Sequence, residues 1–248
     1  MAQQANINDH GVKFAGTVYA RKLGTKNWYD LGNTTSLKIT LSGDKDERIS
    51  HRRDTVGQAL DSLYTPKPAE ISWENDTFNR QNFANMLMGT AADLSGAAQQ
   101  ITDEAIELLP HEGVELGQRN LDENTPLAFK TKDDQPLNLA GKVEINHRLG
   151  LIRLNEGNKT EAKVSYATRE NKGFAINAAT LTSLELELRV DGLNRATGEN
   201  SVLSVWHASV TANDGMDWLS GDWGKASFSG TCVTPGDKNS PFRLEVLG

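Results

Sequence analysis

The chain has 248 residues, of which 37% are hydrophobic and 24% charged, so it is long enough to bury a sizeable core. Its 26 basic and 33 acidic side chains leave a formal net charge of −7, which argues against an extended phosphate-neutralising surface and so against tight nucleic-acid binding. No apolar run approaches the ~18 residues that a membrane span needs, and the opening MAQQANINDHG lacks a signal-peptide pattern, which predicts a protein made and folded in a cytoplasm.

The first part of the chain is typical of β-structure. A polar arm at residues 1–10 has no hydrophobic periodicity and is predicted to be flexible. Residues 12–23 then alternate between apolar and polar side chains, and residues 37–42 do so again after a turn. We expect these two segments to form an antiparallel pair or meander with one apolar and one wet face.

Residues 43–68 form the least regular part of the first half. The segment is charged, ends in two prolines and contains one weak apolar patch. Roughly 25 residues is long for a structureless connection in a compact domain, and such loops are usually functional. Two interpretations stay open: a solvated excursion, or a partner-binding loop that becomes ordered only in an assembly.

A single short helix is predicted within residues 76–89, after the strand-like run AEISWE. Asp76 or Thr77 would cap its start, and Phe78, Phe83 and neighbouring apolar residues gather on one side. Gly89 would end it in the left-handed conformation. We therefore expect one helix docked on a β body.

The second half returns to strand patterns. The run ITDEAIELL reads as a strand, residues 113–141 are weakly patterned, and alternation resumes in 142–154 and 162–168. The clearest pair is a hairpin that joins residues 184–190 to 202–207, followed by strands at 225–233 and 242–247.

The tryptophans are expected to be mostly internal. Residues 216–223 read as a short turn with Trp218 and Leu219 tucked inward. The other four tryptophans stand in strand-like runs, where a core position is the more frequent one; they are Trp28, Trp73, Trp206 and Trp223.

The sequence offers no pattern typical of catalysis or metal binding. The five histidines lie far apart, and the lone Cys232 reads as a buried small side chain. Phosphate-loop, nucleophile-elbow and dinucleotide-binding motifs are missing. These observations predict a non-enzymatic β protein without a cofactor.

The order of segments resembles the tail tube proteins of long-tailed bacteriophages of the siphophage type. The resemblance rests on GTVYARKLGTKNWYDLGNTTSLKITL, the charged loop, AEISWENDTFNRQNFANMLMGT, ITDEAIELLPHEGVELGQRNL and LELELRVDGLNRATGENSVLSVWHASV. It implies a mainly β fold of two packed antiparallel sheets, sandwich-like or barrel-like, with one flanking helix and a long charged loop. It also implies a single tail tube domain, here with an insertion within 113–172.

In function, the resemblance implies a structural virion protein. Six copies would join sheet edges into a ring, and rings would stack into the hollow tube through which the genome is ejected. The implied partners are further copies of the chain and the tail initiator, tape measure and tail terminator proteins, with DNA only passing through. The protein would reside in the virion after assembly in the host cytoplasm.

Two groups of residues are candidate sites under this hypothesis. The polar faces of the early strands, with Glu185, Glu187 and Arg189, are candidates for lining the lumen. The loop 43–68 is the candidate contact between rings, through Asp44, Asp46, Glu47, Arg48, Arg52, Arg53, Asp54, Val56, Leu60 and Leu63. Because exposed ion pairs are individually weak, the apolar members should carry more of the contact energy.

Two other classes of protein stay open. A type VI secretion-like tube protein shares the ring plan and would be distinguished by its gene neighbourhood. A monomeric carbohydrate-binding or capsid-decorating β sandwich would use tryptophan as a stacking platform, with Trp218 as the candidate.

Overall fold

The computed structural model describes residues 11–247, so the predicted arm at 1–10 lies outside the described residues. In all, 53% of residues are in strands and 3% in helix. The paired strands in its sheets are antiparallel, and the described residues contain one helix. The prediction of a mainly β, antiparallel fold with a single short helix is confirmed.

The chain divides into two compact units, which are described separately. Unit 1 comprises the chain up to Ala91 and from Ile176 onwards, and unit 2 comprises Ala92–Ala175. The range 113–172, in which the sequence analysis placed an insertion, lies inside unit 2, which has a core of its own.

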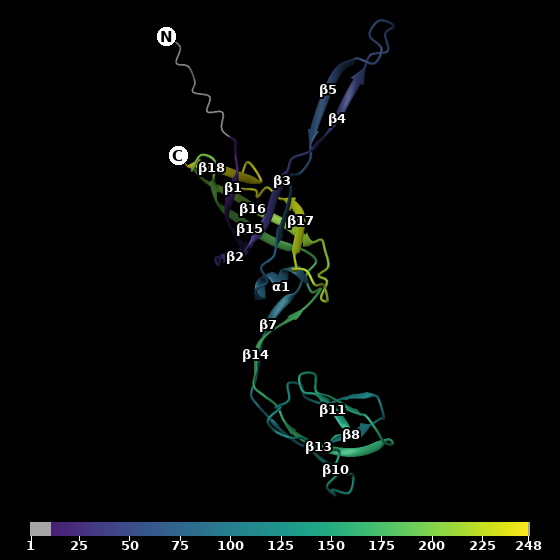
Figure 1. Ribbon diagram of the computed structural model, residues 1–248. Helices are drawn as coiled ribbons and strands as arrows, with labels where there is room; N and C mark the ends of the chain where they lie inside the picture. Colours follow the sequence, from purple (N-terminus) through teal and green to yellow (C-terminus); the bar gives the residue numbers. More distant parts are fainter. Residues whose placement is uncertain (1–10, 248) are drawn as a thin grey trace. The chain divides into compact units, whose positions relative to one another are not determined.

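Unit 1 is built on one eight-stranded sheet with the order β2-β1-β15-β16-β17-β6-β3, in which β18 also pairs with β16 (Figure 1). Its strands are β1 (Phe14–Lys22), β2 (Tyr29–Asp30), β3 (Thr34–Thr40), β6 (Glu70–Asn75), β15 (Leu184–Asn194), β16 (Asn200–Ala212), β17 (Ala226–Cys232) and β18 (Phe242–Leu247). The hairpin expected from residues 184–190 and 202–207 is confirmed as β15 and β16.

Alternation along these strands gives the sheet one buried and one polar face. Leu184, Leu186 and Leu188 of β15 are buried, whereas the residues between them are partly exposed. Trp73 of β6 stacks on Phe228 of β17 with 5.0 Å between ring centroids, within the same core. The apolar face thus holds the core of unit 1, and the opposite face is left to polar side chains.

The helix α1 spans Arg80–Met86 and is shorter than predicted. Its N-cap is Asn79, whose side chain accepts a hydrogen bond from the backbone N–H of Asn82, so the predicted caps Asp76 and Thr77 are wrong. At the other end Met88, not Gly89, takes the left-handed conformation, with φ of 46°. The helix nevertheless packs Met86 into the core of unit 1, as its amphipathic pattern requires.

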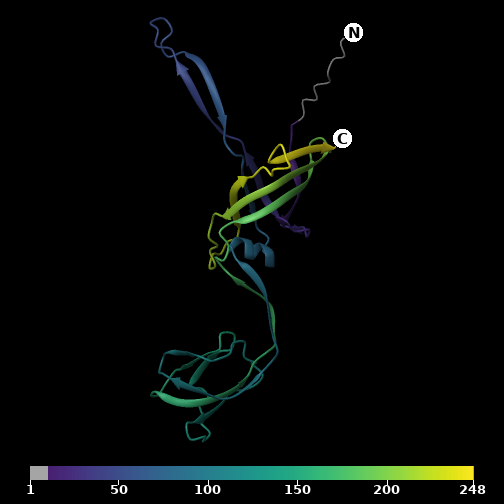
Figure 2. The same ribbon diagram turned by 180° about the vertical axis from the view of Figure 1, so that it is seen from behind.

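The segment 43–68 is a β-hairpin and not a structureless loop. Strand β4 (Gly43–Ile49) pairs with β5 (Ala59–Pro66) through a connection at 50–58. Figures 1 and 2 show both strands leaving the main sheet on the side away from α1. Sequence patterning missed these strands because neither face of the hairpin is buried, so no apolar alternation marks it.

Residues 213–224, within the segment that joins β16 to β17, are called the Trp loop here. Its Trp218 side chain is 64% exposed, and Leu219 and Trp223 are each 95% exposed, so the prediction that these residues are internal is wrong. Trp73 is buried as expected, whereas Trp28 and Trp206 are half-buried. The Trp loop therefore presents apolar surface that unit 1 does not cover.

Unit 2 consists of two three-stranded sheets around its own core. They are β10-β13-β8 and β11-β12-β9, formed by β8 (Gln100–Leu108), β9 (Gly113–Glu115), β10 (Ala128–Thr131), β11 (Val143–Asn146), β12 (Leu151–Leu154) and β13 (Thr160–Ala167). The chain leads into unit 2 along β7 (Thr90–Gly96) and out along β14 (Asn171–Asn177), and these two strands pair with each other.

Candidate functional site

The hairpin formed by β4 and β5 is the most exposed element of unit 1. Every residue of β5 and every residue of β4 except Gly43 is exposed. Even so, the hairpin carries large apolar side chains: Val56 and Leu63 are each 65% exposed, and Leu60 is 50% exposed. Ile49 and Tyr64, which the sequence reasoning did not select, are exposed beside them. Several large apolar side chains on one exposed element indicate a contact surface.

Most charges of the hairpin pair with each other. Arg48 contacts Asp61 at 2.6 Å, and Lys67 contacts Asp44 at 2.6 Å. Lys45 and Glu47 form a third pair. All of these side chains are exposed, so each pair contributes little stability and remains available to a partner. The predicted contact residues thus lie together on one hairpin.

The turn of the hairpin, residues 50–58, is ordered by hydrogen bonds and is called the hairpin tip here. The Ser50 N–H donates to the Gln58 carbonyl at 2.8 Å, and the Ser50 hydroxyl lies 2.7 Å from that of Thr55. Ser50 itself is buried, whereas Arg52 and Arg53 are exposed. Neither guanidinium has an ion-pair partner within residues 11–247. The tip therefore presents two unpaired cations on a preformed turn.

The polar face of the main sheet holds the three predicted lumen residues. Glu187 forms an ion pair with Arg21 of β1 at 2.5 Å. The guanidinium groups of Arg21 and Arg189 lie 4.7 and 4.9 Å from the centre of the Trp28 ring. Strands β1 and β15 thus bring both signs of charge together around one indole.

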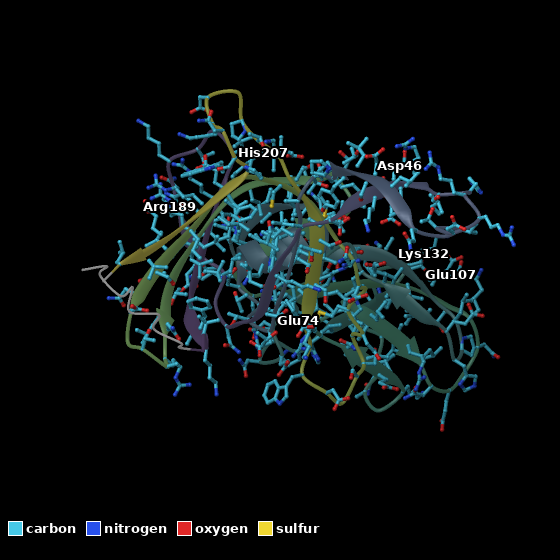
Figure 3. All side chains as sticks on the ribbon, turned by 90° about the horizontal axis from the view of Figure 1, so that it is seen from above. Asp46, Glu74, Glu107, Lys132, Arg189 and His207 are labelled. Atoms are coloured by element: carbon cyan, nitrogen blue, oxygen red, sulfur yellow. The ribbon has the colours of Figure 1, made fainter. Side chains whose placement is uncertain are left out.

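Glu185 accepts three hydrogen bonds on the same face. Its carboxylate lies 2.5 Å from His207 Nε2, 2.6 Å from the Ser183 hydroxyl and 2.8 Å from the Ser209 hydroxyl. Burial acts to raise the pKa of Glu185, but these hydrogen bonds outweigh it and the pKa of Glu185 is lowered. Figure 3 shows His207 and Arg189 among the side chains of this sheet.

The polar face continues across β17, β6 and β3. Ser229 pairs with Ser72, which in turn pairs with Lys38. Near the end of β6, Glu74 (Figure 3) accepts from Lys225 at 3.0 Å. The hydrogen bond from Lys225 is the main reason why the pKa of Glu74 is lowered. This face of the sheet thus presents many hydroxyl and charged groups.

The described residues do not assemble a metal site. Within 11–247, no three His, Cys, Asp or Glu side chains are placed to hold a metal ion. Cys232 is buried, as predicted, and burial raises the pKa of its thiol to about 11. No helix in this range is long and apolar enough to cross a membrane.

An apolar groove of about 570 Å³ is lined by residues of strands β1 and β3. Val18, Leu203 and Phe242 contribute to its lining. Sequence reasoning missed this groove because it depends on how β3 and β18 are placed against β1 and β15, which no local pattern specifies.

The architecture defines a class of mainly β proteins in which an antiparallel sheet with an exposed hairpin carries an inserted second β unit. The chain belongs to the family described as "Protein of unknown function UCP028589", whose model matches residues 12–241. No curated protein matches the sequence significantly.

Proposed function

We propose that this protein is the tail tube subunit of a long-tailed bacteriophage of the siphophage type. In this function it assembles into hexameric rings, and the rings stack into the hollow tube through which the genome is ejected. The observation that carries the proposal is the hairpin formed by β4 and β5. An ordered hairpin with Val56, Leu60 and Leu63 exposed is best explained by a contact with another subunit, because isolated two-stranded hairpins are marginally stable in water.

The polar face of the main sheet supports the same function. Glu185, Glu187 and Arg189 would face the lumen, where paired charges and hydroxyl groups present little net positive charge to passing DNA. Each phosphate neutralised by Lys or Arg would add a salt-dependent grip, and the chain as a whole is acidic, with a net charge of −7. A genome duct of this composition would conduct DNA without holding it.

The mechanism is passive, and no enzymatic step or cofactor belongs to it. Further copies of the chain are the main partner, with tail initiator, tape measure and tail terminator proteins at the ends and inside the tube. The protein would therefore act in the virion after assembly in the host cytoplasm.

The first experiment is negative-stain electron microscopy of the purified protein, fresh and after concentration. It is repeated with the triple variant Val56→Ser/Leu60→Ser/Leu63→Ser, which keeps the length of the hairpin and removes its apolar contacts. Leu149→Ser in unit 2 is the matched control, because Leu149 is exposed to a similar degree as Leu60.

Rings or hollow tubes formed by the wild type and the control but not by the triple variant would support the proposal. Tubes formed equally well by the triple variant would show that the apolar side chains of the hairpin do not form the contact between subunits. A wild-type protein that stays monomeric at every concentration, and also when mixed with tail initiator proteins, would refute the tube function.

A carbohydrate-binding module is the second candidate, and the exposed indoles of Trp218 and Trp223 favour it. Exposed tryptophan rings provide stacking platforms for sugars. A monomer whose tryptophan fluorescence changes on titration with bacterial surface polysaccharide, and not in the double variant Trp218→Ala/Trp223→Ala, would support this alternative.

A further inference from the structure

The Trp loop combines a buried anchor with an exposed apolar end. Met216 packs against the core of unit 1, whereas Trp218, Leu219 and Trp223 extend into solvent. Tryptophan is the residue type most enriched at the energetic centres of protein interfaces. Three large apolar side chains in one short loop therefore indicate a contact with another molecule.

The Trp loop and the hairpin emerge at opposite ends of the same strands. In the pairing of β6 with β17, Glu70 stands opposite Thr231, and Asn75 stands opposite Ala226. The hairpin ends just before Glu70, and the Trp loop ends just before Ala226. A second copy displaced along the strand direction would bring its Trp loop towards the hairpin of the first.

The two segments also carry complementary charge. The Trp loop contains Asp214, Asp217 and Asp222, and the one basic residue of the connection, Lys225, follows the loop and is paired with Glu74 of β6. The hairpin tip contains Arg52 and Arg53, beside His51 and a single carboxylate, Asp54. The three aspartates, like the two arginines, form no ion pair within residues 11–247.

We propose that the Trp loop of one copy is the docking site for the hairpin tip of the next copy. The inference rests on the proposed function, since it names the surface that receives the hairpin between rings. Arg52 and Arg53 contact the indoles and aspartates of the Trp loop, and Val56 packs against Leu219. The contact joins two different surfaces, so it repeats head to tail in one direction.

The chain already contains an arrangement of this kind. Arg21 and Arg189 lie on Trp28, with the Glu187 carboxylate bound to Arg21. Two guanidinium groups, one indole and a carboxylate thus lie together within unit 1. The proposed contact would build the same chemistry between two copies, with the arginines and the indoles supplied by different chains.

Disulfide cross-linking of the full-length chain tests the contact directly. The variant Val56→Cys/Leu219→Cys has one thiol in the hairpin tip and one in the Trp loop, and the native Cys232 is buried and contributes little background. Under mild oxidation we expect a ladder of covalent multimers on non-reducing gels. The matched control, Val56→Cys/Leu149→Cys, has its second thiol at an exposed leucine of unit 2 and should form no ladder.

Charge reversal supplies a second readout. Arg52→Glu/Arg53→Glu and Asp217→Arg/Asp222→Arg should each raise the protein concentration needed for tube formation roughly tenfold or more, and the chain with all four changes should recover. Circular dichroism and thermal unfolding verify that each variant folds.

The outcomes separate this inference from the proposed function. Tubes that form while the Val56→Cys/Leu219→Cys ladder stays absent would overturn the docking site and leave the tube function intact. A wild-type chain that never self-associates would overturn both.

Discussion

The two units are predicted to unfold as separate transitions, and buried leucines offer the test. Leu108 of unit 2 and Leu188 of unit 1 are both 0% exposed and belong to different core clusters. A Leu→Ala substitution at a fully buried site removes transfer free energy and leaves a cavity, with a typical cost of about 2–5 kcal/mol. We take about 3 kcal/mol for each site.

The size of each unit determines how far this loss of unfolding free energy lowers the midpoint temperature of its transition. For a unit as long as Ala92–Ala175, each 1 kcal/mol lowers the midpoint by about 4–8 °C, so Leu108→Ala should lower the unit 2 transition by about 12–24 °C. Unit 1 is larger, and each 1 kcal/mol there corresponds to about 2–4 °C, so Leu188→Ala should lower its transition by about 6–12 °C.

Differential scanning calorimetry of the full-length chain is the assay. We expect two transitions in the wild type, of which Leu108→Ala moves one and Leu188→Ala moves the other. A single transition that both substitutions shift together would refute the reasoning, because it would mean that the two cores unfold cooperatively.

Three further predictions concern unit 1. Cys232 should react with a thiol reagent at pH 8 only as fast as the protein opens, because its side chain is buried and burial also raises the pKa of its thiol; rapid labelling of the native protein would contradict this. Replacing the N-cap in Asn79→Ala should cost about 1 kcal/mol in urea unfolding, whereas Asn79→Asp should cost little, and equal losses would contradict a capping role. The lowered pKa of Glu185 means that its carboxylate stabilises the fold above the ordinary value of 4.5, and that this contribution is lost as the pH falls through the lower folded-state pKa. Glu185→Gln should therefore flatten the acid-side fall in the free energy of unfolding between pH 6 and 3, and parallel curves would contradict the assignment.

Alternation predicted the parts of the fold in which one strand face is buried. Leu184, Leu186 and Leu188 share the core face of β15, so apolar residues recur at every second position of this segment. This alternation predicted the β15–β16 hairpin correctly. The same reasoning identified Glu185, Glu187 and Arg189 as members of one polar face. The sequence also predicted correctly that Cys232 is a buried side chain.

Elements without a buried face escaped this reasoning. Strands β4 and β5 are held by backbone pairing and bury almost nothing, so their side chains look like those of a charged loop. The boundary between the units was missed for a related reason: the strand run in β8 continues the pattern of unit 1 although it belongs to the core of unit 2.

The Trp loop shows a more general limit of composition. A large apolar side chain reads as core in a sequence, because burial within the chain and burial against another chain require the same residue types. Trp73 and Trp223 are therefore indistinguishable by type, and only the fold separates the first, which stacks on Phe228, from the second, which is exposed. Exposed indoles in a folded unit are thus the signal that sequence reasoning could not supply.

A head-to-tail contact between the hairpin tip and the Trp loop has a consequence for the length of the assembly. Because the two surfaces lie at opposite ends of the same strands, every copy added along the strand direction would present a new unoccupied hairpin, and the stack would stay open. Closure into rings would need a second, lateral contact, and the outer edges of β3 and β18 are the candidates for it, because neither edge pairs with another strand in the described part of the chain. Lateral pairing would then fix the number of copies in a ring, whereas stacking through the hairpin would set no limit. If the chain builds a tube, the tube's length must therefore be set by other molecules and not by this subunit.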